Sequence, residues 1–195
     1  MPPELVVAFV EMVRAHVARA ASIDVLSGPL RAGFLLLDQQ LDARELRLHG
    51  PDMQTLPLRA IDDVAIALHT MLEHRLVPAS FGVVEQPCHM DDRALVQTEL
   101  PHAALVMARS APRAELPHDS GWFFANLDHN NAAELRVMSL YELVTRAPHV
   151  LPYLSLPVDT QVTFRDTHGA VHVHGQLRAP TPHSYAAARL APPAP

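Results

Sequence analysis

The main constraint on the fold of this chain is how often proline interrupts it. Eighteen of the 195 residues are proline, against seven glycines. Proline fixes φ and has no N–H to donate, so it ends helices and is excluded from central strands. The spacing predicts many short elements with stiff connections. Because 49% of the residues are apolar, these elements can still bury a core, in one domain of ordinary size or two small ones.

The N-terminal half has the pattern of a helix-rich unit. Apolar residues at three- and four-residue spacing predict two amphipathic helices, and short apolar or alternating runs predict two strands. These helices and strands are expected at residues 4–21, 61–76, 33–37 and 46–49. Gly28-Pro29 ends the first helical segment and Pro78 closes the second. We assign residues 1–97 to this α-rich unit.

The C-terminal half alternates strand patterns with turns. Strands are expected at residues 103–109, 121–126, 135–138, 161–165 and 170–178. Ser139 and Glu142 have the spacing of a capping box, which predicts that a helix begins there. Residues 98–178 form this second domain, and residues 179–195 form a Pro/Ala-rich tail. The fold class is therefore α+β, with a helix-rich unit followed by a small mixed or antiparallel sheet and one or two packed helices.

The charge of the chain limits its partners. Its net charge is −6, which disfavours binding to nucleic acid or to an anionic membrane and is compatible with a basic protein partner. The single cysteine, Cys88, cannot form an intramolecular disulfide, so a reducing cytoplasm fits best. The N-terminus lacks the features of a signal peptide, and no apolar run has the length of a membrane span.

Three late histidines are the strongest candidates for enzymatic chemistry. His168, His172 and His174 lie close together, and the last two would share one face of a strand, where they could bind one metal ion. A small metal-dependent hydrolase is the alternative function that follows. The opposing interpretation, which we favour, is that these side chains are solvated, because they lie opposite the apolar face of the strand.

Other routes to catalysis or cofactor binding find less support. Asp119-Ser120-Gly121 lacks the flanking pattern of a nucleophile elbow and is more simply a turn whose side chains bond local amides. No glycine-rich nucleotide-binding motif is present. We therefore expect no cofactor and no catalytic residue.

The stretch from His118 to Glu142 carries the features of a recognition surface. It contains Trp122, Phe123 and Phe124, followed by a polar loop. In a strand, Trp122 and Phe124 share one face and Phe123 takes the other. Core packing explains two of these aromatics best. One aromatic left at the surface beside the polar loop would make a protein-binding hot spot.

Four segments, in order, resemble a bacterial immunity-protein family first catalogued as a domain of unknown function and later assigned to polymorphic-toxin and type VI secretion loci. The family's Asp-Ser-Gly-Trp (D-S-G-W) motif, acidic loop, helix start and proline-spaced segment match residues 119–124, 127–130, 137–142 and 151–158. The resemblance covers roughly residues 98–178. Ala125-Asn126 and Asp159 depart from the family's usual loop residues.

The resemblance implies a cytoplasmic protein that binds a cognate secreted toxin, often a nuclease encoded next door, and neutralises it without catalysis. Such an antitoxin would recognise its partner through a few buried anchors with acidic residues around them. The predicted contact residues combine the aromatic motif with the polar loop that follows it. They are Asp119, Trp122, Asp128, His129, Asn130 and Glu134.

Overall fold

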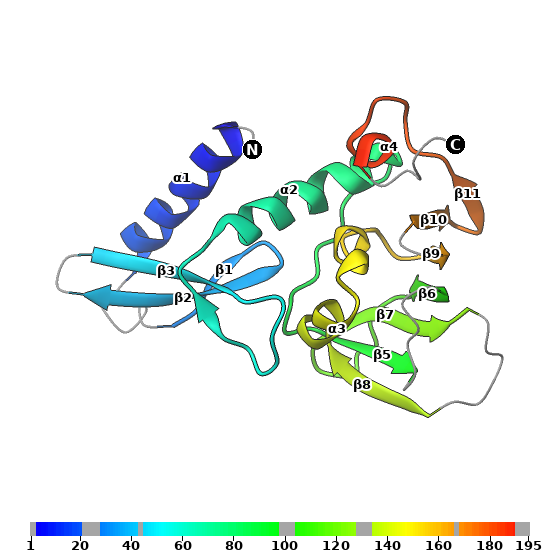
Figure 1. Ribbon diagram of the computed structural model, residues 1–195, viewed down its shortest axis with the longest axis horizontal. Helices are drawn as coiled ribbons and strands as arrows, with labels where there is room; N and C mark the ends of the chain where they lie inside the picture. The colour runs from blue at the N-terminus through cyan, green and yellow to red at the C-terminus, as the bar shows by residue number, and fades with distance from the viewer. Residues whose placement is uncertain are drawn as a thin grey trace. The chain divides into compact units, whose positions relative to one another are not determined.

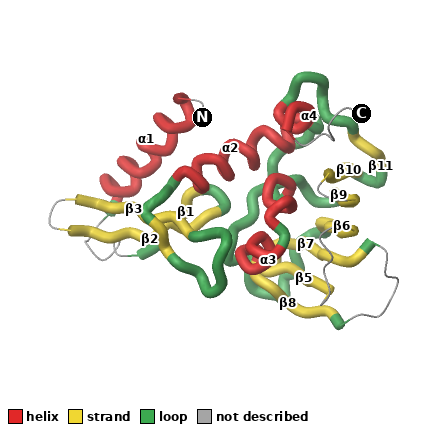
Figure 2. The backbone as a smooth tube through the Cα atoms, in the orientation of Figure 1, coloured by secondary structure: helices red, strands yellow, loops and turns green. Residues whose placement is uncertain are grey.

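The chain folds into two compact units, each of which combines helices with a sheet (Figures 1 and 2). The computed structural model describes residues 3–20, 28–42, 45–97, 104–127, 134–165 and 168–189. The units are Met1–Glu73 and His74–Pro195. This arrangement confirms the α+β class. Within the described ranges, no helix is long and apolar enough to cross a bilayer.

The division between the units falls inside helix α2 (Ala65–Ser80). The sequence predicts a boundary after residue 97 instead. Residues 74–97 belong, by their contacts, to the compact unit that contains the larger sheet. Whether 1–97, 98–178 and 179–195 behave as separate domains stays a prediction.

The N-terminal unit contains helix α1 and a four-stranded antiparallel sheet in chain order. The elements are α1 (Pro3–Arg19), β1 (Leu30–Ala32), β2 (Leu35–Asp42), β3 (Glu45–Pro51) and β4 (Ala60–Ile61). The predicted first helix and the strand at 46–49 are confirmed, with small shifts at their ends. The strand predicted at 33–37 is confirmed in part, because Gly33-Phe34 form the turn between β1 and β2 and the strand continues to Asp42. The core of this unit includes Phe9 of α1 and the buried residues Phe34, Leu35 and Leu37.

Helix α2 differs from its prediction at both ends. It begins at Ala65 because the Asp63 carboxylate accepts a hydrogen bond from the Ala65 amide (2.7 Å). The expectation that Pro78 closes the helix is wrong, because Pro78 lies inside it. A proline at this position leaves the carbonyl of His74 without its helical donor. The hydroxyl of Ser155 supplies the missing hydrogen bond (2.8 Å).

The C-terminal unit is built on a seven-stranded mixed sheet in the order β11-β10-β9-β6-β7-β5-β8. Its strands are β5 (Arg93–Gln97), β6 (Ala104–Arg109), β7 (Asp119–Asn126), β8 (Leu135–Ser139), β9 (Thr160–Arg165), β10 (His168–Val173) and β11 (Gln176–Arg178). Only the β5–β7 pair among these ladders is parallel. Strand β8 is therefore one edge of the described sheet.

One face of this sheet, which we call the inner face, holds the core of the unit. Helix α3 (Leu140–Arg146) and the 3₁₀ helix η2 (Pro148–Tyr153) follow β8 in the chain and pack on this face, as Tyr153 does edge-on against Phe164 (5.3 Å between centroids). The predicted cap is present, because the Ser139 hydroxyl accepts from the Glu142 amide (3.1 Å). The fully buried inner-face residues include Leu105, Met107, Trp122, Phe124, Val162 and Phe164.

The last predicted hairpin is confirmed in part. Strands β9 and β10 pair antiparallel from Arg165↔His168 to Thr160↔Val173. The expected strand over 170–178 is wrong, because the chain turns at His174-Gly175, where both residues have positive φ, and returns as β11. Leu177 therefore does not share the buried face of β10 and is 67% exposed.

The beginning of the predicted tail is ordered against α2. A short helix, α4 (Tyr185–Arg189), forms within it and buries Ala186. The Ser80 carbonyl accepts from the Thr181 amide (2.8 Å), and the Ser80 hydroxyl accepts from the Ala186 amide (3.1 Å). The end of α2 thus satisfies its free groups with the segment that follows the sheet.

Candidate functional site

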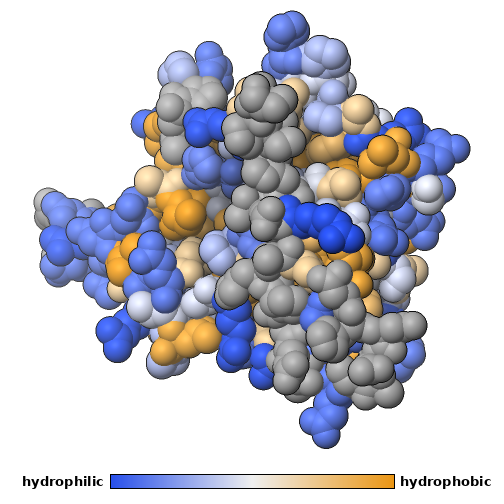
Figure 3. Space-filling model, turned by 45° about the vertical axis from the view of Figure 1, so that its right-hand side comes forward, coloured by the Kyte–Doolittle hydropathy of each residue, from blue (hydrophilic) through white to orange (hydrophobic). Residues whose placement is uncertain are grey.

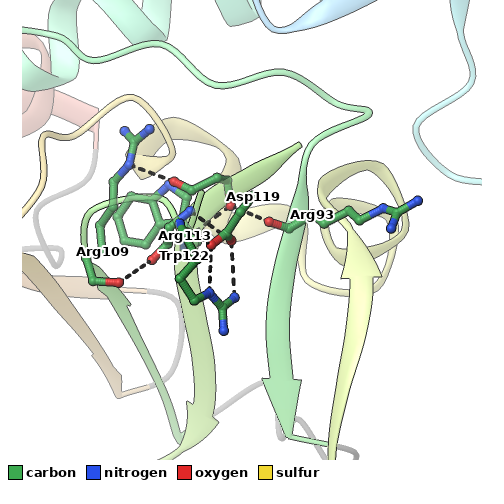
Figure 4. Close-up of polar contacts among 8 residues, drawn as sticks. Arg93, Arg109, Arg113, Asp119 and Trp122 are labelled. Carbon is green, nitrogen blue, oxygen red and sulfur yellow. Dashed lines mark hydrogen bonds and ion pairs between the residues drawn. The ribbon is translucent and has the colours of Figure 1, made fainter. Parts of the chain in front are cut away.

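The turn formed by Asp119, Ser120, Gly121 and Trp122 begins strand β7 with a bulge (Figure 4). Arg93 pairs with Asp119 and Leu95 with Phe123, so β7 advances four residues while β5 advances two. Gly121 makes the bulge possible. Its φ is +76°, and a Cβ atom there would lie 2.1 Å from the carbonyl oxygen of Ser110. No other residue fits this position without moving the backbone.

The Asp119 carboxylate closes the loop before β7. It accepts hydrogen bonds from the Nε (2.7 Å) and the amide (2.8 Å) of Arg113, and from the amide of Gly121 (3.2 Å). Its side chain is only 2% exposed. Burial acts to raise the pKa of Asp119, but the hydrogen bonds from Arg113 and Gly121 outweigh it and lower the pKa below its usual value. The carboxylate is therefore charged, and its hydrogen bonds are made within the protein.

Ser120 is bonded in the same way. Its hydroxyl donates to the carbonyl of Arg93 (2.7 Å) and accepts from the amide of Trp122 (3.2 Å). This is the expected bonding of a turn, and it ties β7 to β5. Ser120 is only 2% exposed, and its hydroxyl already donates to a carbonyl. It is therefore not placed to act as a nucleophile.

Trp122 lies in the core, where its indole N–H donates to the carbonyl of Leu154 (3.1 Å). The guanidinium of Arg109 stacks over its ring, 5.5 Å from the centroid. Arg109 is buried and donates to five backbone carbonyls, those of Gln86, Pro87, Ser120, Leu154 and Leu156. This one side chain thus joins three segments that are far apart in sequence.

Two further buried groups pack into the same region, and burial perturbs both. Desolvation lowers the pKa of His74 to about 4, although its Nε2 is 2.8 Å from the carbonyl oxygen of Leu151. Desolvation raises the pKa of the Cys88 thiol to about 12. A neutral imidazole bonded to a carbonyl and a protonated thiol are structural groups, not reactive ones.

Beside this buried cluster lies a surface of exposed apolar and cationic side chains. Leu135 and Val137 of β8 are each 53% exposed, and Leu116 is 37% exposed. A pocket of about 90 Å³ opens between Val137, Leu116 and the guanidinium-bearing residues Arg93 and Arg113. In Figure 4 the Arg93 side chain points away from the Trp122 cluster. We call the set Arg93, Arg113, Leu116, Leu135 and Val137 the β8 edge surface.

Exposed apolar residues also occur elsewhere, so exposure alone does not define a site. The face in Figure 3 shows hydrophobic patches separated by hydrophilic side chains. What distinguishes the β8 edge surface is that it combines an edge strand, a pocket and the arginines Arg93 and Arg113 with a hydrogen-bonded cluster behind it. A surface that is already rigid in the free protein loses less conformational entropy when it binds a partner.

The predicted contact residues fall into three groups. Asp119 and Trp122 are buried, so in the free protein they support the surface instead of forming it. Glu134 is exposed and directly precedes β8. Asp128, His129 and Asn130 lie outside the described residues. Because Asp119 is level with Ser139 at the far end of β8, it lies roughly 16 Å along the strands from Glu134.

Sequence reasoning did not single out Arg93, Arg109, Arg113, Leu116 or Val137. A single arginine ending the apolar run of β6 was the available signal for Arg109, because a buried guanidinium must find many acceptors. No comparable signal exists for Arg93 and Val137. Their importance follows from the position of β8 at a sheet edge, which the sequence does not reveal.

The structure describes the side chains of two of the three late histidines. His174 lies beyond the end of β10 with φ +49°, and its Nδ1 is 3.5 Å from a carboxylate oxygen of Asp159. His172 stays on the strand, and both His172 and His174 line an open hollow of about 470 Å³ together with Asp159. The side chain of His168 lies outside what the structure describes. Among the described residues, no three His, Cys, Asp or Glu side chains are grouped to hold a metal ion.

A family model identifies the class of this protein. Residues 73–174, more than half of the chain, match the Imm33-like domain. The chain therefore belongs to the Imm33-like family, an immunity-protein-like family, and the matched region begins at the division between the two compact units. No curated protein and no solved structure matches the chain.

Proposed function

We propose that this protein neutralises a cognate antibacterial toxin by binding it one to one, without catalysis. The observation that carries the proposal is the Imm33-like match over the unit that contains the β8 edge surface. The polar groups of the Asp119–Trp122 turn are bonded inside the protein, which suits a rigid binding scaffold. Recognition by a preorganised surface needs no reacting group.

The toxin class follows from the family resemblance. We propose a secreted effector of a type VI or polymorphic-toxin system, a nuclease encoded beside this gene, which this protein meets in the cytoplasm. A protein that protects its own cell has to bind the toxin where the toxin acts. The net charge of −6 supports a nuclease partner, because nucleic-acid enzymes present basic grooves.

We propose that contact involves the loop of Asp128, His129 and Asn130, together with Glu134 and the β8 edge surface. Asp119 and Trp122 contribute by holding this region rigid. Glu134 lies at one end of β8, and the cationic side chains of Arg93 and Arg113 lie near the other. The proposed surface thus has an acidic end and a basic end, which would fix the orientation of the partner.

Co-expression with the product of the neighbouring reading frame tests the function. We expect growth to be rescued and a one-to-one complex to be isolated. Titration against toxin activity should reach full inhibition at about one protein per toxin, because a stoichiometric binder cannot turn over. Undiminished toxicity without a complex, or inhibition at a small fraction of one equivalent, would reject stoichiometric immunity.

Charge reversal at the acidic end tests the surface. Glu134→Lys is expected to weaken binding of the toxin, and Glu85→Lys, an exposed residue in the loop before β5, is the matched control. Loss of about tenfold in affinity with Glu134→Lys alone would support this end of the surface. Equal effects of the two substitutions would mean that only overall charge matters.

A further inference from the structure

We propose that the toxin presents an extended, acidic segment that pairs with β8 as an additional strand of the sheet. This inference rests on the proposed function and names the chemistry of the contact. Extended peptides bind exposed sheet edges through main-chain hydrogen bonds, and side chains at alternate positions supply the specificity. Strand β8 offers both the edge and the side chains.

The hydrogen-bond register shows which backbone groups of β8 are available. The amide of Leu140 donates to the carbonyl of Asp92 (2.8 Å), one step beyond the Ser139↔Arg93 pair. Bonded and non-bonded pairs alternate in an antiparallel ladder, so Met138 and Arg136 are bonded to β5. The N–H and C=O groups of Leu135 and Val137 consequently face away from β5, where a further strand would lie, whereas Ser139 at the end of the strand caps α3.

The side chains of β8 divide by face in the same way. Leu135 and Val137 are on the outer face of the sheet and are exposed, next to the pocket at Leu116. Arg136 points to the other face with the buried Met138. An added strand would therefore place apolar side chains beside Leu135 and Val137. Between them it would place a residue that faces Arg136.

Charge selects an acidic segment. Arg93 flanks the pocket, Arg113 does so while paired with the Asp119 carboxylate, and the Nε of Arg136 is buried with no hydrogen-bond partner among the described residues. A buried guanidinium nitrogen lacking an acceptor is costly, and a carboxylate from an added strand would satisfy it. The negative charge of the whole chain does not prevent this, since charges farther than about 8 Å are screened at physiological salt.

The unit that contains β8 has the smaller excess of acidic side chains. Residues 1–73 contain ten acidic and six basic side chains, whereas residues 74–195 contain eleven and nine. A second copy of this chain fits the edge less well, because pairing β8 with itself would bring two sets of Arg93, Arg113 and Arg136 into one interface. Like charges facing each other across strands are destabilising.

Proline at the outward-facing position tests the main-chain pairing. Val137→Pro removes an N–H that points away from β5, a change that edge strands tolerate, whereas Val137→Ala shortens the side chain and keeps the N–H. With the purified toxin, we expect Val137→Pro to weaken binding roughly 100-fold and Val137→Ala less than about tenfold. The fluorescence of the buried Trp122 and the denaturation midpoint check that each variant is folded.

Hydrogen exchange provides a test in the unmodified protein. The amides of Leu135 and Val137 should exchange fast in the free chain and become protected in the complex. Arg136→Gln should weaken binding and reduce its salt dependence, whereas Arg178→Gln at the opposite edge of the sheet should not.

The outcomes separate this inference from the proposed function. Absence of any complex with the neighbouring toxin contradicts immunity itself. A complex in which the Val137 amide stays unprotected, or which Val137→Pro and Val137→Ala weaken equally, overturns strand addition alone. Dimerisation of the free chain that Val137→Pro abolishes would show a second copy at the edge and overturn the acidic partner segment.

Discussion

The start of β7 and the whole of β8 lie two strands apart in one sheet, yet they are built in opposite ways. At the start of β7, the carboxylate of Asp119, the hydroxyl of Ser120 and the indole of Trp122 all have hydrogen-bond partners and are buried. On β8, Leu135 and Val137 are exposed. The Asp-Ser-Gly-Trp motif thus marks a buried turn that only particular residues can form. The exposed surface beside it has no such requirement.

This contrast bears on how motifs of such families are interpreted. A bulge with a positive φ, a buried carboxylate and a buried indole each require one particular residue, so they give a recognisable sequence pattern. A binding surface can change with its partner and needs no fixed pattern. We therefore expect substitutions at the start of β7 to affect stability first, and substitutions of the exposed Leu135 and Val137 on β8 to affect binding alone.

The largest expected effect is at Arg109. Arg109→Met keeps most of the apolar stem but removes the shared donor of five carbonyls, and three of the lost hydrogen bonds are buried, so we expect a loss of about 3 to 5 kcal/mol in the free energy of unfolding. Chemical denaturation followed by Trp122 fluorescence measures it. A loss below about 1 kcal/mol would mean that water replaces the guanidinium easily. In that case the cluster is not the rigid support described above.

Gly121→Ala should follow in magnitude. The added Cβ would meet the Ser110 carbonyl at 2.1 Å in a backbone with φ +76°, and we expect a loss of roughly 2 to 4 kcal/mol. Gly82→Ala is the matched control, because Gly82 has φ +67° with no atom within 4 Å of the added Cβ. It isolates the conformational strain, about 1 kcal/mol. Similar losses in both variants would contradict the steric role of Gly121.

Acid should lower the free energy of unfolding because of His74. Its pKa is about 4 when folded and about 6.5 when unfolded, so the unfolded chain takes up the proton first as the pH falls. Stability is complete above about pH 6.5 and decreases by roughly 3 kcal/mol as the pH falls to about 4. His74→Gln should flatten this part of the profile. Asp119, whose pKa is lowered, contributes a separate loss only below its ordinary value of about 3.9.

The smallest effects are expected on the exposed edge. Val137→Ser and Arg93→Gln should each change the free energy of unfolding by less than about 0.5 kcal/mol, because both side chains are exposed in the free protein. Thermal unfolding of the two variants beside Arg109→Met completes the comparison. A loss above about 1 kcal/mol at either position would show that the β8 edge surface supports the fold as the start of β7 does.

The local parts of the fold could be predicted from the sequence. The Ser139 cap, the sharing of one face by Trp122 and Phe124, and the β9–β10 hairpin depend on neighbours in the chain. Two local predictions were wrong. Pro78 stays inside α2 while Ser155 satisfies the freed carbonyl of His74. The strand expected to continue past Val173 turns at His174-Gly175 and returns as β11.

The candidate surface could be predicted only in outline. The sequence drew attention to Asp119 and Trp122, and the structure places both in the interior next to an exposed surface formed by other residues. The contribution of Asp128, His129, Asn130 and Glu134 stays a prediction. Arg93 and Val137 are candidates only because β5 and β8 lie at one edge of the sheet. This strand order follows from pairings between segments far apart in the chain.

By itself, the sequence of this protein determined the α+β class, most helix and strand positions and the resemblance to an immunity-protein family, because periodicity, capping and turn residues act over a few neighbours. The tertiary structure decided which strand lies at the edge, which polar groups are buried and which arginine joins the segments at Gln86, Ser120 and Leu156. These depend on contacts between distant residues, and no local pattern encodes them.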